Sequence, residues 1–233
     1  MINYTITQKP KGGLSMASIT LKNLNKLFRS SYPAVKDVSV EIHDGEFAVF
    51  YGPSGCGKST ILRMIGGLED ISSGEIYLGD ELLNDILPRD RKLAMAFPNY
   101  KLYGYLNVFD NMSVGLKLRN LPRTVINARV HEAADFLGIS NVLDKKIKHI
   151  TELQKKKTAL GRAIVCHPKV LLVDEAFLHE DEVIRREVLR YLRKINRRLK
   201  ITILYSTHTY EDALTVGSKI IYMKDGKIEK IQA

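Results

Sequence analysis

The feature that most constrains this chain is a glycine-rich loop that joins an apolar stretch to a helical pattern. Apolar residues 47–51 predict a strand before the loop, and the spacing over 61–65 predicts a helix after it. This order of strand, G-x-x-x-x-G-K-[ST] loop and helix is the P-loop pattern, which binds nucleoside triphosphates. The loop consists of Gly52, Pro53, Ser54, Gly55, Cys56, Gly57, Lys58, Ser59 and Thr60.

Each part of the loop has a physical use in binding phosphate. Glycines permit backbone angles that turn consecutive N–H groups inward, toward an anion. Lys58 brings a positive charge to the outer phosphates, and the Ser59 hydroxyl can ligate Mg²⁺. A dinucleotide-binding loop is excluded, because Thr60 stands where the third glycine of G-x-G-x-x-G would be.

Two later apolar runs end in polar residues that suit phosphate chemistry. Residues 170–173 lead into Asp174 and Glu175, and residues 201–205 are followed closely by His208. Such runs are typical of strands buried on both faces of a parallel sheet, where ligands bind at the carboxyl ends. We expect Asp174 to be a direct or water-mediated partner of Mg²⁺ and Glu175 to polarise the attacking water. We expect His208 to contact the γ-phosphate.

The remaining patterns predict an α/β fold with three parts. A mainly parallel sheet surrounds the P-loop, and half-buried strands at 19–24 and 35–42 suggest an antiparallel β portion beside it. A helical insertion is expected over about 98–166. Its predicted helices are 107–118, 123–137 and 154–166. Further strands are predicted at 75–78, 92–97, 220–223 and 227–231.

Composition limits the class of protein and its partners. With 45% hydrophobic residues the chain is globular, and its formal charge of +10 favours nucleotide, nucleic acid or an anionic membrane surface. Its two cysteines, Cys56 and Cys166, imply neither a disulfide framework nor a zinc site. No uncharged apolar run is long enough to span a bilayer, and no signal-peptide pattern is present, so a cytosolic protein is expected. Residues 1–15 are expected to form a flexible tail.

An amphipathic helix is predicted over 181–199, with one strongly basic face. Its apolar stripe consists of Ile184, Val188, Leu192, Ile195 and Leu199. The basic residues are Arg185, Arg186, Arg190, Arg193, Lys194, Arg197 and Arg198. Such a face can bind nucleic acid or acidic lipid, but a solvated surface is the simpler interpretation.

Two aromatic residues between the first two strands are candidates to stack on a base. These are Phe28 and Tyr32, and for either one a place in the core or on the surface is an equal alternative.

Together these motifs resemble the ATPase subunit of ATP-binding cassette (ABC) transporters, from about residue 18 to 231. Within that family the chain looks most like bacterial importers of sugars and glycerol phosphate. The resemblance also rests on residues 99–103, 108–112, 159–165, 206–208 and 223–229.

The resemblance implies a P-loop NTPase (RecA-like) fold with an N-terminal antiparallel β subdomain and an α-helical subdomain, forming one ATPase domain over 16–233. It also implies two subunits that sandwich two ATP molecules with Mg²⁺, and transmembrane permease subunits at the cytoplasmic face of the bacterial inner membrane. The coupling segment would lie near 100–106. Phe28 best matches the base-stacking aromatic of the family.

Departures from the family pattern bear on hydrolysis. Pro98 replaces a glutamine and has no side chain to ligate Mg²⁺ or water. Residues 150–154 stand where the family has the signature L-S-G-G-Q. Thr151 keeps the hydroxyl that would reach the γ-phosphate bound to the other subunit. Glu152 instead brings a carboxylate to the place where that phosphate would lie. Two like charges about 4 Å apart, at an effective dielectric constant near 20, repel by roughly 4 kcal/mol.

Three functions are therefore compared. The first is an importer ATPase, and the second is a weakly hydrolysing nucleotide-binding subunit that acts in a heterodimer or as a regulatory module. The third is a non-transport ABC protein acting on nucleic acid, which the charge and the basic helix suggest. The resemblance of residues 99–112 to the transporter-coupling surface favours the first two, so no nucleic acid partner is expected.

Overall fold

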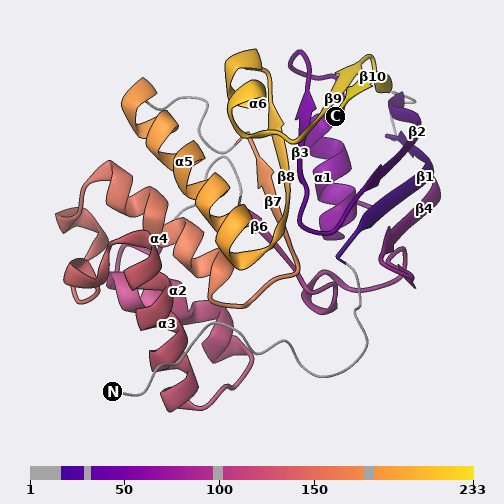
Figure 1. The fold of residues 1–233 in the computed structure, drawn as a ribbon. Coiled ribbons are helices and arrows are strands. Elements are labelled where there is room, and N and C mark those ends of the chain that lie inside the picture. The colour runs from indigo at the N-terminus through magenta and orange to yellow at the C-terminus, as the bar shows by residue number, and fades with distance from the viewer. Residues whose placement is uncertain (1–16, 29–32, 97–101, 176–180) are drawn as a thin grey trace.

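A parallel sheet forms the centre of the molecule in the computed structural model, which describes residues 17–28, 33–96, 102–175 and 181–233 (Figure 1). Its strand order is β10-β9-β3-β8-β7-β6, parallel except for the antiparallel pair β9 and β10. The strands are β3 (Phe47–Tyr51), β6 (Leu93–Ala96), β7 (Val170–Asp174), β8 (Thr202–Thr207), β9 (Lys219–Lys224) and β10 (Lys227–Gln232). All residues of β7 and β8 are buried, as apolar runs in a parallel sheet require. The predicted parallel sheet is confirmed.

A second, antiparallel sheet has the order β2-β1-β4-β5. Its strands are β1 (Ile19–Leu27), β2 (Pro33–Ile42), β4 (Ser73–Leu78) and β5 (Glu81–Leu82). Buried and exposed residues alternate along β2, so one face packs inward and the other meets solvent. The predicted antiparallel portion is confirmed, while the two-residue β5 was not predicted.

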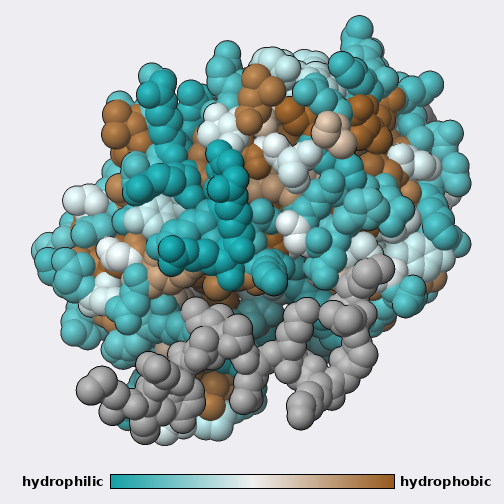
Figure 2. Space-filling model, viewed as in Figure 1, coloured by the Kyte–Doolittle hydropathy of each residue, from teal (hydrophilic) through white to brown (hydrophobic). Residues whose placement is uncertain are grey.

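Helix α1 (Lys58–Gly66) lies between the two sheets, and α5 (Glu182–Leu199) and α6 (Tyr210–Val216) cover the other face of the parallel sheet (Figure 1). Alternate residues of β3 therefore enter different cores: Ala48 and Phe50 pack with α1, and Phe47 and Val49 pack on the other side. The predicted stripe of α5 faces the core, and hydrophilic side chains cover its outer face (Figure 2). Helix α6 was missed, because seven residues hold too few turns for a periodic signal.

The helical part consists of α2 (Val108–Leu118), α3 (Arg123–Leu137) and α4 (Glu152–Ile164), with short 3₁₀ turns at Ser140–Val142 and Ile147–His149. A further 3₁₀ turn, Pro88–Asp90, precedes β6. All three predicted helices are confirmed, although α4 begins two residues earlier than expected. In the described parts of the chain, no helix combines the length and the apolar character needed to cross a membrane.

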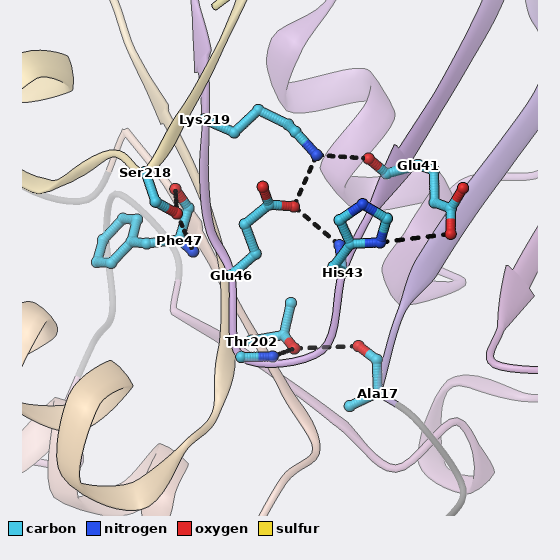
Figure 3. Close-up of polar contacts among 9 residues, drawn as sticks. Ala17, Glu41, His43, Glu46, Phe47, Thr202, Ser218 and Lys219 are labelled. Atoms are coloured by element: carbon cyan, nitrogen blue, oxygen red, sulfur yellow. Dashed lines mark hydrogen bonds and ion pairs between the residues drawn. The ribbon is translucent and has the colours of Figure 1, made fainter. Parts of the chain in front are cut away.

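Polar contacts join the two sheets near the amino end of β3 (Figure 3). Lys219 Nζ donates to Glu46 Oε2 at 2.8 Å and to the Glu41 carbonyl oxygen at 2.9 Å. Thr202 Oγ1 donates to the Ala17 carbonyl oxygen at 3.0 Å. Because these groups come from both sheets, they fix the sheets relative to each other at the edge opposite the strand carboxyl ends.

Arg91 closes the carboxyl end of α1. Its guanidinium donates to the carbonyl oxygens of Met64 and Ile65 at 2.8 and 2.9 Å, and to that of Ile86 at 2.8 Å. The last carbonyls of a helix lack intrahelical partners, so a buried cation there satisfies them and complements the helix dipole. Burial lowers the pKa of Arg91.

We expect Arg91→Met to lower the free energy of unfolding by about 2–4 kcal/mol, because buried carbonyls would lose charged hydrogen bonds. Urea denaturation measures this change. The matched control is Arg89→Met, two residues away and 80% exposed, which should cost less than about 0.5 kcal/mol. Equal losses in the two variants would contradict this role.

A buried carboxylate fastens α6 to the molecule. Asp212 Oδ1 lies 3.6 Å from Arg185 Nε, and Tyr205 donates its hydroxyl to Asp212 Oδ2 at 3.4 Å. Burial raises the pKa of the Asp212 carboxyl, against the opposing effect of Arg185. The folded protein therefore binds a proton at this group more tightly than the unfolded chain does.

This shift predicts a pH dependence with a definite sign. As the pH falls from neutral toward the ordinary pKa of a carboxyl group, the free energy of unfolding of the wild type should rise relative to that of Asp212→Asn, whose amide does not titrate. Urea denaturation of both proteins across this range provides the measurement. A difference between them that is constant with pH would disprove the effect.

Candidate functional site

The glycine-rich loop joins β3 to α1 in a conformation that other residues cannot adopt. Gly57, the N-cap of α1, has φ 102°, and a Cβ there would lie 2.5 Å from the Ala34 carbonyl oxygen. A Cβ on Gly52 would lie 2.2 Å from the carbonyl oxygen of Met223. Close packing thus requires glycine at both positions, and the backbone angle requires it at Gly57 as well.

The first turn of α1 presents backbone N–H groups without a side-chain partner. Gly57 has no side chain to cap the helix, and the first turn contains no acidic residue. Helices usually satisfy these N–H groups with a capping side chain. Their availability here, together with the positive end of the helix dipole, makes this turn suited to an anion.

A distant hairpin turn supports the loop. Gly226, between β9 and β10, donates its N–H to the Cys56 carbonyl oxygen at 3.2 Å. Its own carbonyl oxygen accepts from the Lys36 N–H of β2 at 2.8 Å. The turn therefore links the loop to the antiparallel sheet, a contact that sequence reasoning missed because 170 residues separate its partners.

Lys58 points its ammonium group into the loop. It is 2% exposed, and Nζ donates to the carbonyl oxygens of Gly52 and Pro53, each at 2.8 Å. Nζ also lies 3.3 Å from Glu175 Oε1. The structure thus brings together two of the predicted residues, and the lysine charge is balanced by the carboxylate.

Ser206 organises the two acids at the end of β7. Its Oγ donates to Asp174 Oδ1 at 2.8 Å and accepts from the Glu175 N–H at 2.9 Å. Asp174 is fully buried, and its Oδ2 has no hydrogen-bond partner among the described residues. An unpartnered buried carboxylate oxygen is costly, and a cation or a water bound to it would remove the cost.

Glu175 is held in an unusual backbone conformation. Its φ is 38°, in the left-handed region that residues other than glycine seldom adopt. The Ser206 hydrogen bond and the Lys58 contact hold its backbone and its carboxylate, respectively. Strain of this kind is concentrated at functional sites.

The other predicted residues lie at various distances from this centre. His208 is exposed and follows β8, whose Thr207 carbonyl oxygen accepts from the Gly52 N–H at 3.3 Å, so it lies close in sequence to a loop contact. Ser59 and Thr60 lie half-buried in the first turn of α1. Phe28 follows β1, is 37% exposed, and its ring centre lies 5.1 Å from Lys26 Nζ.

Thr151 is exposed, at the start of a helix that packs into a different core. It is the N-cap of α4, where it accepts from the Gln154 N–H at 3.2 Å while its own N–H donates to Gln154 Oε1 at 2.9 Å. Helix α4 packs into the core on the face of the parallel sheet opposite α1. Tyr32 and Pro98 fall outside the described residues.

The comparisons with known proteins decide the family. A family model described as ABC transporter matches residues 35–178, which is more than half of the chain. The chain belongs to the ABC transporter family. Its predicted fold class is confirmed by an ABC cassette captured as a dimer in a post-hydrolysis state with ADP and Pi. That structure is 27% identical with a TM-score of 0.77, over 92% of this chain and 97% of the other.

Relatives among curated proteins are named as import ATP-binding proteins. One is the oligosaccharides import ATP-binding protein MsmX of Bacillus subtilis, 45% identical over 216 residues. Another is the sn-glycerol-3-phosphate import ATP-binding protein UgpC of Rhodopseudomonas palustris, 43% identical over 216 residues. Each alignment covers 93% of this ABC family member and 59% of the relative, so the chain spans about three fifths of their length.

We expect Ser206→Ala to lower the free energy of unfolding by about 2–3 kcal/mol, because Asp174 Oδ1 and the Glu175 N–H would lose their shared partner. The control is Ser113→Ala. Ser113 is fully buried, and among the described residues its Oγ donates to the Asp110 carbonyl oxygen alone, so its loss should cost under about 1 kcal/mol. Urea denaturation compares the two. If Ser113→Ala is as destabilising, Ser206 has no special role at the acids.

Proposed function

We propose that this chain is the ATP-binding subunit of an ABC importer, which binds and hydrolyses Mg-ATP to drive solute uptake through transmembrane permease subunits. The observation that carries the proposal is the meeting of the phosphate loop with two acids: Lys58 lies 3.3 Å from Glu175, beside the buried Asp174. This ATP hydrolysis would take place at the cytoplasmic face of the bacterial inner membrane. The ATPase domain would extend over 16–233, with 1–15 as a tail.

The loop residues are suited to the phosphates of ATP. The free N–H groups of the first α1 turn, the three glycines and Lys58 would hold the phosphate chain. Incoming phosphate oxygens would compete with Glu175 for the lysine ammonium. Phe28, exposed beyond β1, would stack on the base, with the Lys26 ammonium on its ring.

The residues present also fit a magnesium ion. The orphaned Asp174 Oδ2 and the Ser59 hydroxyl would hold Mg²⁺, directly or through water. The described residues contain no group of three or more His, Cys, Asp or Glu able to hold a metal alone, which matches an ion that takes its other ligands from phosphate and water. When bound, Mg²⁺ neutralises charge that develops on the phosphate oxygens.

Glu175 is the candidate to orient and polarise the attacking water. Once phosphate draws Lys58 away, its carboxylate is free to accept a hydrogen bond from that water, while Ser206 keeps its backbone in place. His208, after the neighbouring strand, would contact the γ-phosphate.

The names of the relatives suggest the transported solute. Because MsmX and UgpC are named as import ATP-binding proteins for oligosaccharides and sn-glycerol-3-phosphate, we propose a sugar or glycerol-phosphate type of solute. A dimeric relative supports a second ATPase subunit as partner.

A second candidate is a weakly hydrolysing subunit that works beside a different partner. Glu152 opens α4 where a dimer partner's phosphate would approach, and its carboxylate pairs with Lys155 at 2.6 Å. This exposed pair offsets only part of the repulsion, since surface ion pairs are worth under about 1 kcal/mol. Thr151 keeps its hydroxyl proton for a phosphate, because its oxygen is the acceptor in the cap.

Mg-ATP binding and steady-state hydrolysis by one purified sample test the first candidate. Lys58→Ala should weaken binding by about 100-fold, whereas the exposed control Lys92→Ala should leave it unchanged. Glu175→Gln should bind normally and hydrolyse about 10²–10³-fold more slowly. Binding unaffected by Lys58→Ala would refute a phosphate site at the loop.

The same assay separates the two candidates. Hydrolysis well above the Glu175→Gln background favours an ordinary symmetric pair. Hydrolysis at that background, raised about tenfold or more by Glu152→Gly, favours the heterodimer, because the substitution removes the repelling carboxylate. Glu182→Gly, at the start of α5, is the control for loss of an acidic residue in a first helical turn.

A further inference from the structure

Five cationic side chains line a shallow hollow on the outer face of α5. The hollow measures about 330 Å³, and we call it the α5 hollow. Its lining residues are Arg190, Arg193, Lys194, Arg197 and Arg198. Their spacing of three and four residues places them on one side of the helix, where Figure 2 shows hydrophilic side chains gathered.

Most of this charge has no compensating carboxylate. Arg190 pairs with Glu187 at 2.7 Å, and Lys194 Nζ donates to the Phe136 carbonyl oxygen at 2.6 Å. In the part of the chain that the structure describes, Arg193, Arg197 and Arg198 have neither an ion pair nor a side-chain hydrogen bond. Three guanidiniums therefore present free donors into one hollow.

Three cationic side chains lie around the aromatic ring of Tyr191, beside the hollow. Tyr191 has Lys157 Nζ 4.4 Å from its ring centre, Arg190 at 5.5 Å and Lys194 Nζ at 5.6 Å. Lys157 comes from α4, so two helices contribute to the cluster. The attraction of each cation to the ring is offset by repulsion among the cations, which a bound anion would relieve.

The negative end of the α5 dipole does not explain the cluster. That effect is confined to the last helical turn, where Arg197 and Arg198 lie. Arg190, Arg193 and Lys194 come earlier. The grouping of all five around a concave surface thus points to a ligand.

We propose that the α5 hollow binds a soluble compound that carries several adjacent phosphate groups. Guanidinium forks match phosphate oxygens, and a hollow of this volume suits a compact polyanion. Insertion into a bilayer is disfavoured, because the apolar stripe of α5 is already packed in the core. The site is separate from the P-loop: residues 190–198 lie roughly 12–24 Å along the helix from its first residue, which follows the β7 end of the candidate nucleotide site.

Isothermal titration of the full chain with sodium tripolyphosphate, in magnesium-free buffer, tests the proposal. We expect saturable binding that persists in Lys58→Ala, which disables the P-loop. The variant R193Q/R197Q/R198Q should weaken binding by at least about 30-fold, and Arg193→Gln alone should give a smaller loss.

The control R89Q/R119Q/R123Q removes the same charge from exposed positions elsewhere and should bind tripolyphosphate as the wild type does. Circular dichroism checks that each variant is folded. Absence of saturable binding, loss of binding in Lys58→Ala, or equal losses in the two triple variants would each overturn the proposal. So would binding only to phosphatidylglycerol vesicles or to a single-stranded oligonucleotide.

Discussion

The structure depends on the first turn of α1, whose backbone N–H groups have no side-chain cap among the described residues. A helix that leaves its first donors without a cap loses stability, so its position must be enforced from outside. Ala34 and Met223 press on Gly57 and Gly52 so closely that no other residue fits, and the Gly226 turn bonds the loop from a third side. These contacts come from both sheets. The surrounding fold thus holds in place an uncapped helix start whose backbone N–H groups suit an anion.

Charge balance at the carboxyl ends of the strands follows from the same constraint. Lys58 is only 2% exposed and therefore needs hydrogen-bond acceptors within the protein. These are two loop carbonyl oxygens and the Glu175 carboxylate. A fully buried Asp174 needs donors, yet among the described residues only one of its oxygens has one. The site therefore holds the Lys58 ammonium, which can bind phosphate, and Asp174 Oδ2, which can bind a cation. Neither feature is explained by stability alone.

Sequence reasoning succeeded where the determinants are local. Consecutive or periodic residues encode the strand-loop-helix order around the P-loop, the apolar runs of β7 and β8 and the stripe of α5, and the structure confirms these elements. It failed where a side chain reaches across the chain. Ser206 serves an acid 32 residues away, and Arg91 closes a helix 27 residues earlier, and no pattern within a window encodes such pairings. The predicted chemical roles of Phe28, Thr151 and His208 depend on a ligand and a partner, so the fold alone leaves them as predictions.

The two ends of the parallel sheet show how the chain separates stability from chemistry. At the amino end of β3, Lys219, Glu46 and Thr202 have their partners within the protein and join the sheets firmly. At the carboxyl end, strain at Glu175 and an orphaned oxygen of Asp174 persist. Strain and unpaired groups survive only where the surrounding structure over-determines them. Contacts at the amino end fasten β8 and β9 to the antiparallel sheet, and β7, which leads into both acids, is hydrogen-bonded along its length to β8.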